Sequence, residues 1–206
     1  MNILSIDCSN GLMLSLFADK KQYNYFNAEQ KKQSDDLLVQ IDKLLIEAKL
    51  SVKNIDVIAV CVGPGSFTGI RVAISTAKGL AIGSRAKVVT FSSFETIEDL
   101  PDNNYGVIVD GFGTNYYYYF KKFGRIFEGC NTPDKIEKLA DGITVFTLSA
   151  SAAEKITNFV LKTANYSSKK VIEEKIALNK FVLTNQIEPV YLRESQAEIE
   201  RIKHGN

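Results

Sequence analysis

The segment Gly63-Pro64-Gly65-Ser66-Phe67-Thr68-Gly69 decides the fold of this chain. It follows residues 55–62, an apolar run rich in β-branched side chains that predicts a strand buried on both faces. Regular strand pairing ends here, because proline lacks an N–H and glycine adopts backbone angles closed to other residues. Ser66 or Thr68 can cap a following helix over residues 67–82, and apolar residues on two faces of that helix predict neighbours on both sides.

The glycines of this loop fit no standard nucleotide motif. A P-loop ends in Gly-Lys-Ser/Thr, whereas Gly69 is followed by Ile70 and Arg71. The glycines also lie one residue out of register for a dinucleotide fingerprint, and the strand over 87–91 lacks the acid that would bind a ribose. Two interpretations stay open: a tight turn whose glycines serve packing, and an anion site at the helix N-terminus. In either case we expect Gly65 and Gly69 to need a positive φ or a close backbone approach.

The composition is that of an ordinary globular chain. Its 206 residues suffice for one large domain or two small ones, and 45% of them are apolar. The net charge of +1 leaves no general electrostatic footprint for nucleic acid or an anionic membrane, so we expect any RNA to be reached only indirectly, through partners. No apolar run approaches membrane-spanning length and the first residues do not resemble a signal peptide, which predicts a cytoplasmic protein without a membrane partner.

Cysteine and histidine usage excludes several kinds of site. Cys8, Cys61 and Cys130 are odd in number and form no C-x-x-C pair, which favours reduced buried thiols over disulfides or zinc. His204 is the single histidine, so no metal site based on two histidines and no anchored Ser-His couple can be built. This excludes most hydrolase chemistries, and we expect no metal site.

Alternating and helical patterns predict the elements of the first hundred residues. Strands are expected over 3–6, 12–18, 21–28, 55–62 and 87–91, helices over 34–48 and 67–82, and a short helix from about 92 to 99. The run Pro101-Asp102-Asn103-Asn104 is then the strongest boundary in the sequence.

Beyond this boundary the opening pattern of the chain recurs. Residues 105–113 again combine an apolar strand, an aspartate (Asp110) and a small polar turn, before another strand over 114–122. This repeat predicts two lobes. Further helices are expected over 133–140, 150–163 and 171–183, with a strand over 143–148 and a frayed tail.

Four consecutive tyrosines, Tyr116 to Tyr119, raise the possibility of a platform for stacking nucleic acid bases. Successive strand residues point to opposite faces, so at most half of these rings could share one platform. Tyrosine is also a good strand former, and we therefore interpret the run as an ordinary strand.

The sequence resembles the TsaB (YeaZ) family at three places. These are the glycine segment with Ile70-Arg71 and Lys78-Gly79-Leu80-Ala81, the opening strand Ile3-Leu4-Ser5-Ile6-Asp7-Cys8-Ser9, and the closing Pro189-Val190-Tyr191-Leu192-Arg193. The likeness covers residues 1 to about 95 and 189–193. The chain departs from the family pattern at Gln33-Ser34, where a histidine is usual, and at Gly111-Phe112, where an Ala-Arg pair is usual.

The resemblance implies an α/β fold of the actin/Hsp70/sugar-kinase (ASKHA) type with two βββαβα-type lobes. We expect a first lobe over 1–100, to which 189–206 return, and a smaller second lobe over 101–188. In that superfamily the first aspartate and its turn face nucleotide phosphates. The candidate cofactor-binding residues here are Asp7, Ser9, Gly63 and Gly65, with no cofactor required and at most weak, magnesium-dependent binding of ATP or ADP.

The function implied by the resemblance is that of a non-catalytic scaffold in tRNA N6-threonylcarbamoyladenosine synthesis. Such a scaffold would form a homodimer, bind and activate a TsaD-like catalytic subunit, and meet a TsaE-like ATPase through the complex. TsaD-like proteins hold a metal through a pair of histidines, which a chain with only His204 cannot supply. The alternative is an independent ATP-dependent phosphotransferase of the same fold, using Asp7 and Asp110.

The predicted partner surface is a four-helix contact made by the two helices of the first lobe with their counterparts in a second molecule. The alternative is that both faces of these helices are covered within the chain. The interface residues expected from the helical pattern are Ile70, Ala73, Ile74, Ala77, Lys78 and Ala81 of the second helix, and Leu38, Ile41 and Leu45 of the first.

Overall fold

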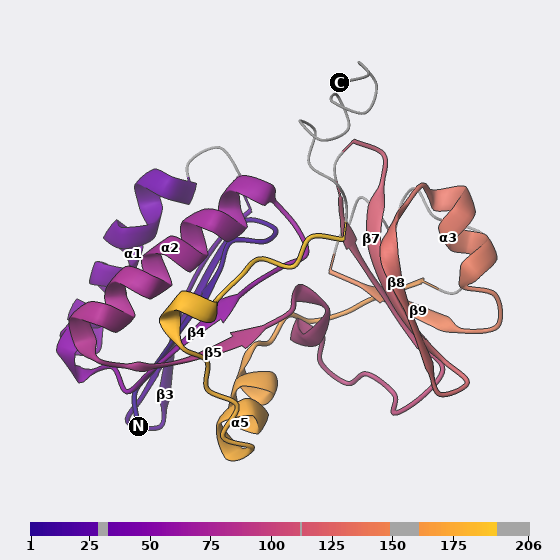
Figure 1. The fold of residues 1–206 in the computed structure, drawn as a ribbon. Coiled ribbons are helices and arrows are strands. Elements are labelled where there is room, and N and C mark those ends of the chain that lie inside the picture. Colours follow the sequence, from indigo (N-terminus) through magenta and orange to yellow (C-terminus); the bar gives the residue numbers. More distant parts are fainter. Residues whose placement is uncertain (29–32, 112, 149–160, 193–206) are drawn as a thin grey trace. The chain divides into compact units, whose positions relative to one another are not determined.

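The computed structural model describes residues 1–28, 33–111, 113–148 and 161–192 (Figure 1). The chain divides into two units, each with its own five-stranded sheet. The first unit contains Met1–Leu100 and Ala164–Val190, and the second contains Pro101–Thr163 and, among the described residues, Tyr191 and Leu192. None of the helices described in these ranges combines the length and hydropathy needed to cross a membrane.

The sheet of the first unit has the strand order β3-β2-β1-β4-β5. Its first three strands form an antiparallel meander, and β4 and β5 extend the other side of β1 in parallel. The strands are β1 (Ile3–Asp7), β2 (Leu12–Ala18), β3 (Lys21–Asn27), β4 (Val57–Cys61) and β5 (Lys87–Phe91). The helices are α1 (Gln33–Glu47), α2 (Phe67–Ser84) and α5 (Lys169–Ala177), with short 3-10 turns at Val52–Asn54, Ser93–Thr96 and Thr184–Gln186.

Helices cover both faces of this sheet. Alternate strand residues, such as Ile58 and Val60 of β4, pack against α1 and α2, which lie side by side (Figure 1). The residues between them, such as Val57 and Ala59, pack with Val171 and Ile172 of α5. Because β4 is buried on both faces, its sequence is a continuous apolar run.

The sheet of the second unit has the order β10-β9-β6-β7-β8. Its strands are β6 (Tyr105–Asp110), β7 (Tyr116–Lys122), β8 (Arg125–Asn131), β9 (Thr144–Thr147) and β10 (Leu161–Thr163). The helix α3 (Pro133–Leu139) connects β8 to β9 and packs through Ile136 on alternate residues of β7. Tyr116 and Tyr118 are accordingly buried, whereas Tyr117 and Tyr119 are only partly buried on the other face. The tyrosine run is a strand, as predicted.

Both sheets follow one topology. In each, the third, second and first strands of the unit are antiparallel neighbours, and the fourth and fifth strands continue in parallel. The first strand of each ends in an aspartate, Asp7 or Asp110. The predicted α/β fold and its internal repeat are confirmed.

Several predicted elements need correction. The strand β8 was not predicted, because four of its residues, from Arg125 to Glu128, are exposed and lack an apolar alternation. The last residues of the helix expected over 150–163 form β10 instead, and 149–160 lie outside the described residues. The helix expected over 171–183 is shorter, ending at Ala177, where Leu178 and Asn179 close it with bonds to the last-turn carbonyls.

The structure also divides the chain differently from the predicted lobes. The returning segment is Ala164–Val190, since α5 supplies the second covering layer of the first sheet. Of the segment 189–206, Val190 does reach the first unit, where its N–H donates to the Val62 carbonyl at 2.8 Å. Residues 193–206 lie outside the described part of the chain.

The prediction of the partner surface is wrong for most of its residues, because these residues belong to the core of the first unit. Only Leu38 and Lys78 of the expected set reach the surface. The others pack against the sheet and the neighbouring helix: Ile70, Ala73, Ile74, Ala77 and Ala81 of α2, and Ile41 and Leu45 of α1. Two faces of α2 carry apolar residues. The buried residues named above lie on the face that packs against the sheet and α1.

We predict that Ile74→Glu lowers the free energy of unfolding by at least about 3 kcal/mol, because it buries a carboxylate without a partner. The matched variant is Ile82→Glu, on the same helix but 73% exposed, which should change stability by no more than about 0.5 kcal/mol. Urea unfolding of both variants measures the difference. Equal stabilities would show that the inward face of α2 has been assigned incorrectly.

Candidate functional site

The candidate site is the turn after β1, where Asp7 ends the strand with a fully buried side chain. The Ser9 amide donates a hydrogen bond to Asp7 Oδ1 at 2.8 Å, and the Tyr166 hydroxyl donates to Oδ2 at 3.2 Å. Tyr166 is brought here by an antiparallel bridge to Ile97. The Cys61 thiol at the end of β4 also hydrogen-bonds the carboxyl group.

Burial raises the pKa of Asp7, and the hydrogen bonds from Ser9, Cys61 and Tyr166 offset only part of this shift. Burial and the neighbouring Asp7 raise the pKa of the Cys8 thiol to about 12, and for the same reasons the pKa of Cys61 lies well above its usual range. Thiols in this state are poor nucleophiles, because the reactive form is the thiolate.

The glycine loop packs directly on this turn through Gly65. A Cβ atom at Gly65 would lie 2.4 Å from the Ser9 carbonyl oxygen, and its φ of +155° is unfavourable for other residues. The next amide, that of Ser66, donates to the same Ser9 oxygen at 2.7 Å. The predicted close backbone approach at Gly65 is confirmed.

Further hydrogen bonds hold the loop from its other sides. The Ser93 hydroxyl donates to the Pro64 carbonyl at 2.6 Å, and the Ser93 amide donates to the Gly63 carbonyl at 2.9 Å. Gly63 has a φ of +100°, and a Cβ atom there would lie 2.7 Å from Ile70 Cδ1. The Val190 amide binds the end of β4, so a distant segment also contributes to this site.

The helix that follows the loop is capped by its own residues. Ser66 is the N-cap of α2, and its hydroxyl accepts a hydrogen bond from the Gly69 amide at 3.2 Å. Gly69 is a buried residue of the helix without a positive φ, so of the two alternatives expected for Gly69 only the close backbone approach stays a prediction.

The structure therefore brings together Asp7, Ser9 and Gly65, while Gly63 packs on Ile70 and reaches Asp7 only through the Cys61 thiol, which hydrogen-bonds both. Their expected role in cofactor binding stays a prediction. The surroundings of Asp7 do not fit a magnesium-nucleotide complex, because the side chain is fully buried and both carboxyl oxygens already accept hydrogen bonds from the protein. Across the described ranges, no group of three or more His, Cys, Asp or Glu side chains could hold a metal ion.

Sequence reasoning did not find two contributors to this site, Tyr166 and Ser93. Tyr166 is 159 positions from Asp7 and lies between the helices expected over 150–163 and 171–183. Ser93 lies at the start of the short helix expected from about 92 to 99, and its hydroxyl donates to the Pro64 carbonyl. Neither role leaves a local pattern, since both depend on contacts made only in the folded chain.

Comparison with known proteins identifies the family. Residues 27–141, more than half of the chain, match the family described as TsaD, tRNA N6-adenosine threonylcarbamoyltransferase. The tRNA threonylcarbamoyladenosine biosynthesis protein TsaB of Buchnera aphidicola subsp. Baizongia pistaciae is 25% identical over 93% of this chain and 98% of its own. The chain belongs to the TsaB/YeaZ family.

Other members agree with this assignment. TsaB of Escherichia coli is 30% identical, over 47% of this chain and 42% of its own length. The structure of YeaZ from Pseudomonas aeruginosa superposes with a TM-score of 0.73 at 21% identity, covering 93% of this chain and 99% of that one. The likeness to YeaZ confirms the predicted ASKHA-like fold with its two related lobes.

We predict that Gly65→Ala destabilises the fold by about 1–3 kcal/mol, because the new Cβ meets the Ser9 carbonyl at an unfavourable φ. The control is Gly79→Ala within α2, where a Cβ atom meets nothing within 4 Å. That variant should be more stable by about 0.5–1 kcal/mol, since alanine favours a helix. Thermal melts measure both, and a neutral Gly65→Ala would contradict the packing role.

We predict that wild type loses stability relative to Asp7→Asn as the pH rises. The pKa of Asp7 is raised in the folded state, so the stability supplied by its neutral carboxyl is complete below the unfolded pKa of about 4. It is lost as the pH rises through the folded pKa, whereas the asparagine stays neutral. Urea unfolding from about pH 4 to about pH 8 tests this, with the exposed Asp42→Asn as control for the loss of one carboxylate. A difference that grows in favour of wild type would contradict it.

Proposed function

We propose that this chain is a non-catalytic scaffold subunit in tRNA N6-threonylcarbamoyladenosine synthesis. In this role it self-associates and binds and activates a TsaD-like catalytic subunit, and it meets a TsaE-like ATPase only through the complex. The membership in the TsaB/YeaZ family and the names of its relatives support the pathway. The cytoplasm is the proposed place of action, where the free cysteines would stay reduced.

The observation that carries the non-catalytic role is the self-contained turn around Asp7. Both carboxyl oxygens are bound by groups of the protein, and the side chain has no exposure to solvent. The amide of Ser66, which opens the helix after the glycine loop, donates to the Ser9 carbonyl. Groups that would have to receive phosphate or metal are therefore used to hold the fold together, and we propose that no cofactor is required and that ATP or ADP affinity at this turn is weak.

The proposed partner surface is the outward side of α1 and α2. Large apolar side chains are exposed there, including Leu38 at 57% and Ile82 at 73%. Gly79 and Gly83, on the same helix as Ile82, have open space around their Cα atoms. Small residues let a second helix approach closely, and exposed apolar side chains supply the area to be buried. This surface replaces the inward-facing set expected from the sequence.

We predict that Ile82→Glu abolishes self-association and binding to a TsaD-like subunit while the chain stays folded. The new charge would have to be buried at the contact without a partner. Leu178→Glu, which changes another largely exposed apolar side chain (65%) at the end of α5, is the matched control. Sedimentation measures self-association and a pull-down measures subunit binding. A folded Ile82→Glu chain that still forms both contacts would refute the surface.

An ATP hydrolysis assay on the purified chain distinguishes the proposed scaffold function from the alternative, an ATP-dependent phosphotransferase. A scaffold should release essentially no phosphate beyond the blank, with or without magnesium. Turnover that is lost in Asp7→Asn would instead support the enzyme and contradict the proposed function.

A further inference from the structure

A second candidate site lies in the second unit, where a cavity of about 520 Å³ opens between the β7–β8 hairpin and the end of α3. Its floor and walls are aromatic and aliphatic: Phe120, Phe123, Phe127 and Leu139. The volume falls in the range of sites for small organic ligands. This cavity has no part in the turn around Asp7 or in the α1–α2 surface.

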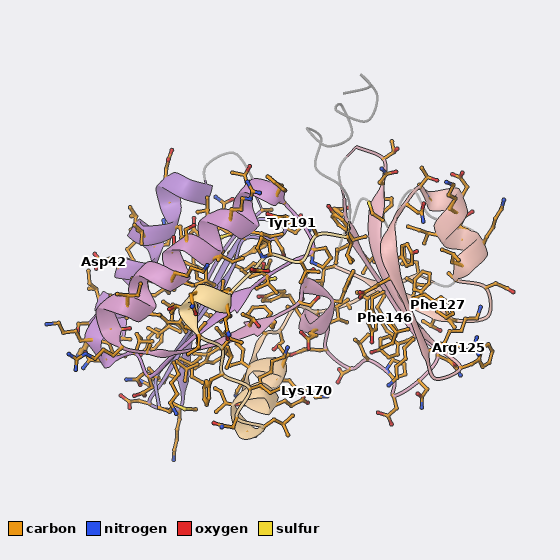
Figure 2. All side chains as sticks on the ribbon, viewed as in Figure 1. Asp42, Arg125, Phe127, Phe146, Lys170 and Tyr191 are labelled. Atoms are coloured by element: carbon orange, nitrogen blue, oxygen red, sulfur yellow. The ribbon has the colours of Figure 1, made fainter. Side chains whose placement is uncertain are left out.

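The cavity exists because α3 is too short to cover the edge of its sheet. Phe120 of β7 pairs across the sheet with Phe127 of β8, so both rings lie on the face that α3 covers. Phe120 is fully buried, but Phe127 remains 45% exposed beyond the seven-residue helix. Figure 2 shows Phe127 and Arg125 together on this strand. The edge of the core is therefore left as an open aromatic wall.

A third ring stands at the tip of the hairpin. Phe123 has a φ of +50° and Gly124 a φ of +74°, a two-residue turn in which glycine, asparagine or aspartate is usual at both positions. A bulky side chain in this conformation costs free energy, and Phe123 is 80% exposed, so burial in the core does not repay that cost. Contact between the Phe123 ring and a ligand in the cavity would offset this free-energy cost.

Three cations line the same cavity: Lys122, Arg125 and Lys138. Lys122 and Arg125 are directly opposite each other in the β7–β8 register, an arrangement that costs free energy through like-charge repulsion. The Lys122 ammonium donates to the Asp141 carbonyl. The ion pairs found in the described ranges join Met1 to Asp56 and Lys175 to Glu95, so they neutralise none of the three. An anion would relieve this repulsion.

We propose that this cavity binds a nucleotide, with the base stacked between Phe123 and Phe127 and the phosphate held by Lys122, Arg125 and Lys138. A flat ring joined to a phosphate uses both features of the site at once, since aromatic walls stack bases and clustered cations bind phosphate. The net charge of +1 does not indicate this cluster of three cations, because acidic residues elsewhere in the chain balance it. The nucleotide can come from a free mononucleotide or from an unpaired position of an RNA strand.

A fluorescent variant provides the direct test. The chain has no tryptophan, so Phe123→Trp places the only indole at the cavity. AMP and a single-stranded oligoadenylate are titrated separately into the full chain with EDTA present. We expect saturable quenching of the indole that does not need magnesium, because the phosphate ligands are cations. Quenching by AMP identifies free mononucleotides as the source, and quenching by the oligomer alone identifies RNA.

Three variants of the otherwise wild-type chain, followed by calorimetry, connect binding to the named groups. Phe123→Ala should weaken binding at least about fivefold through lost stacking. Lys138→Ala should weaken oligomer binding and reduce the slope of log affinity against log salt by about 0.7, as expected for one lost phosphate contact. Lys135→Ala, an exposed lysine of α3 that does not line the cavity, is the control and should change neither.

The proposal is overturned if neither ligand binds, if Phe123→Ala and Lys138→Ala bind as tightly as wild type, or if an acidic peptide of alternating Glu and Phe displaces the nucleotide as the tighter ligand. Phe123 and Lys138 are exposed, so their substitution leaves the fold intact, which thermal melts verify. All measurements use the chain without a partner subunit. A negative result therefore leaves the proposed scaffold function untouched.

Discussion

The contact between Gly65 and the Ser9 carbonyl is the constraint on which the first unit depends. It joins the turn after β1 to the turn after β4, two parallel neighbours whose ends would otherwise be connected only through the sheet. Because Gly65 has no side chain, the loop comes close enough for the Ser66 amide to donate to the Ser9 oxygen. The Asp7 carboxyl in the same turn is fully buried, and this burial raises its pKa.

Sequence patterns predicted this architecture where local chemistry dominates. Apolar runs predicted β1 and β4, and an acidic first turn with helical spacing of leucines predicted α1. The patterns could not distinguish Ile74 from Ile82, because the side chains are identical and only the position of the sheet decides which one is buried. The candidate site was found for Asp7, Ser9 and Gly65, which lie in short motifs. It was incomplete for Tyr166, whose role arises from a contact across 159 positions.

The two units show how one topology gives two different surfaces. In the first, helices cover both faces of the sheet, and α1 and α2 carry several of the exposed large apolar side chains, such as Leu38 and Ile82. In the second, the helix after the meander has seven residues, and Phe127 of the outer strand is left half covered. Helix length thus determines whether exposed apolar area lies on a helix, suited to another helix, or at a sheet edge, suited to a smaller ligand.

The return of Ala164–Val190 to the first unit affects the order in which the protein can fold during synthesis. The strands β1, β4 and β5 leave the ribosome early, but one face of their sheet stays exposed until Val171 and Ile172 have been made. The strands of the second unit are all complete by Thr163, although the chain returns to this unit from Tyr191. Its sheet can therefore form while the first unit still presents apolar strands to solvent, and the nascent chain is most vulnerable to aggregation during that interval.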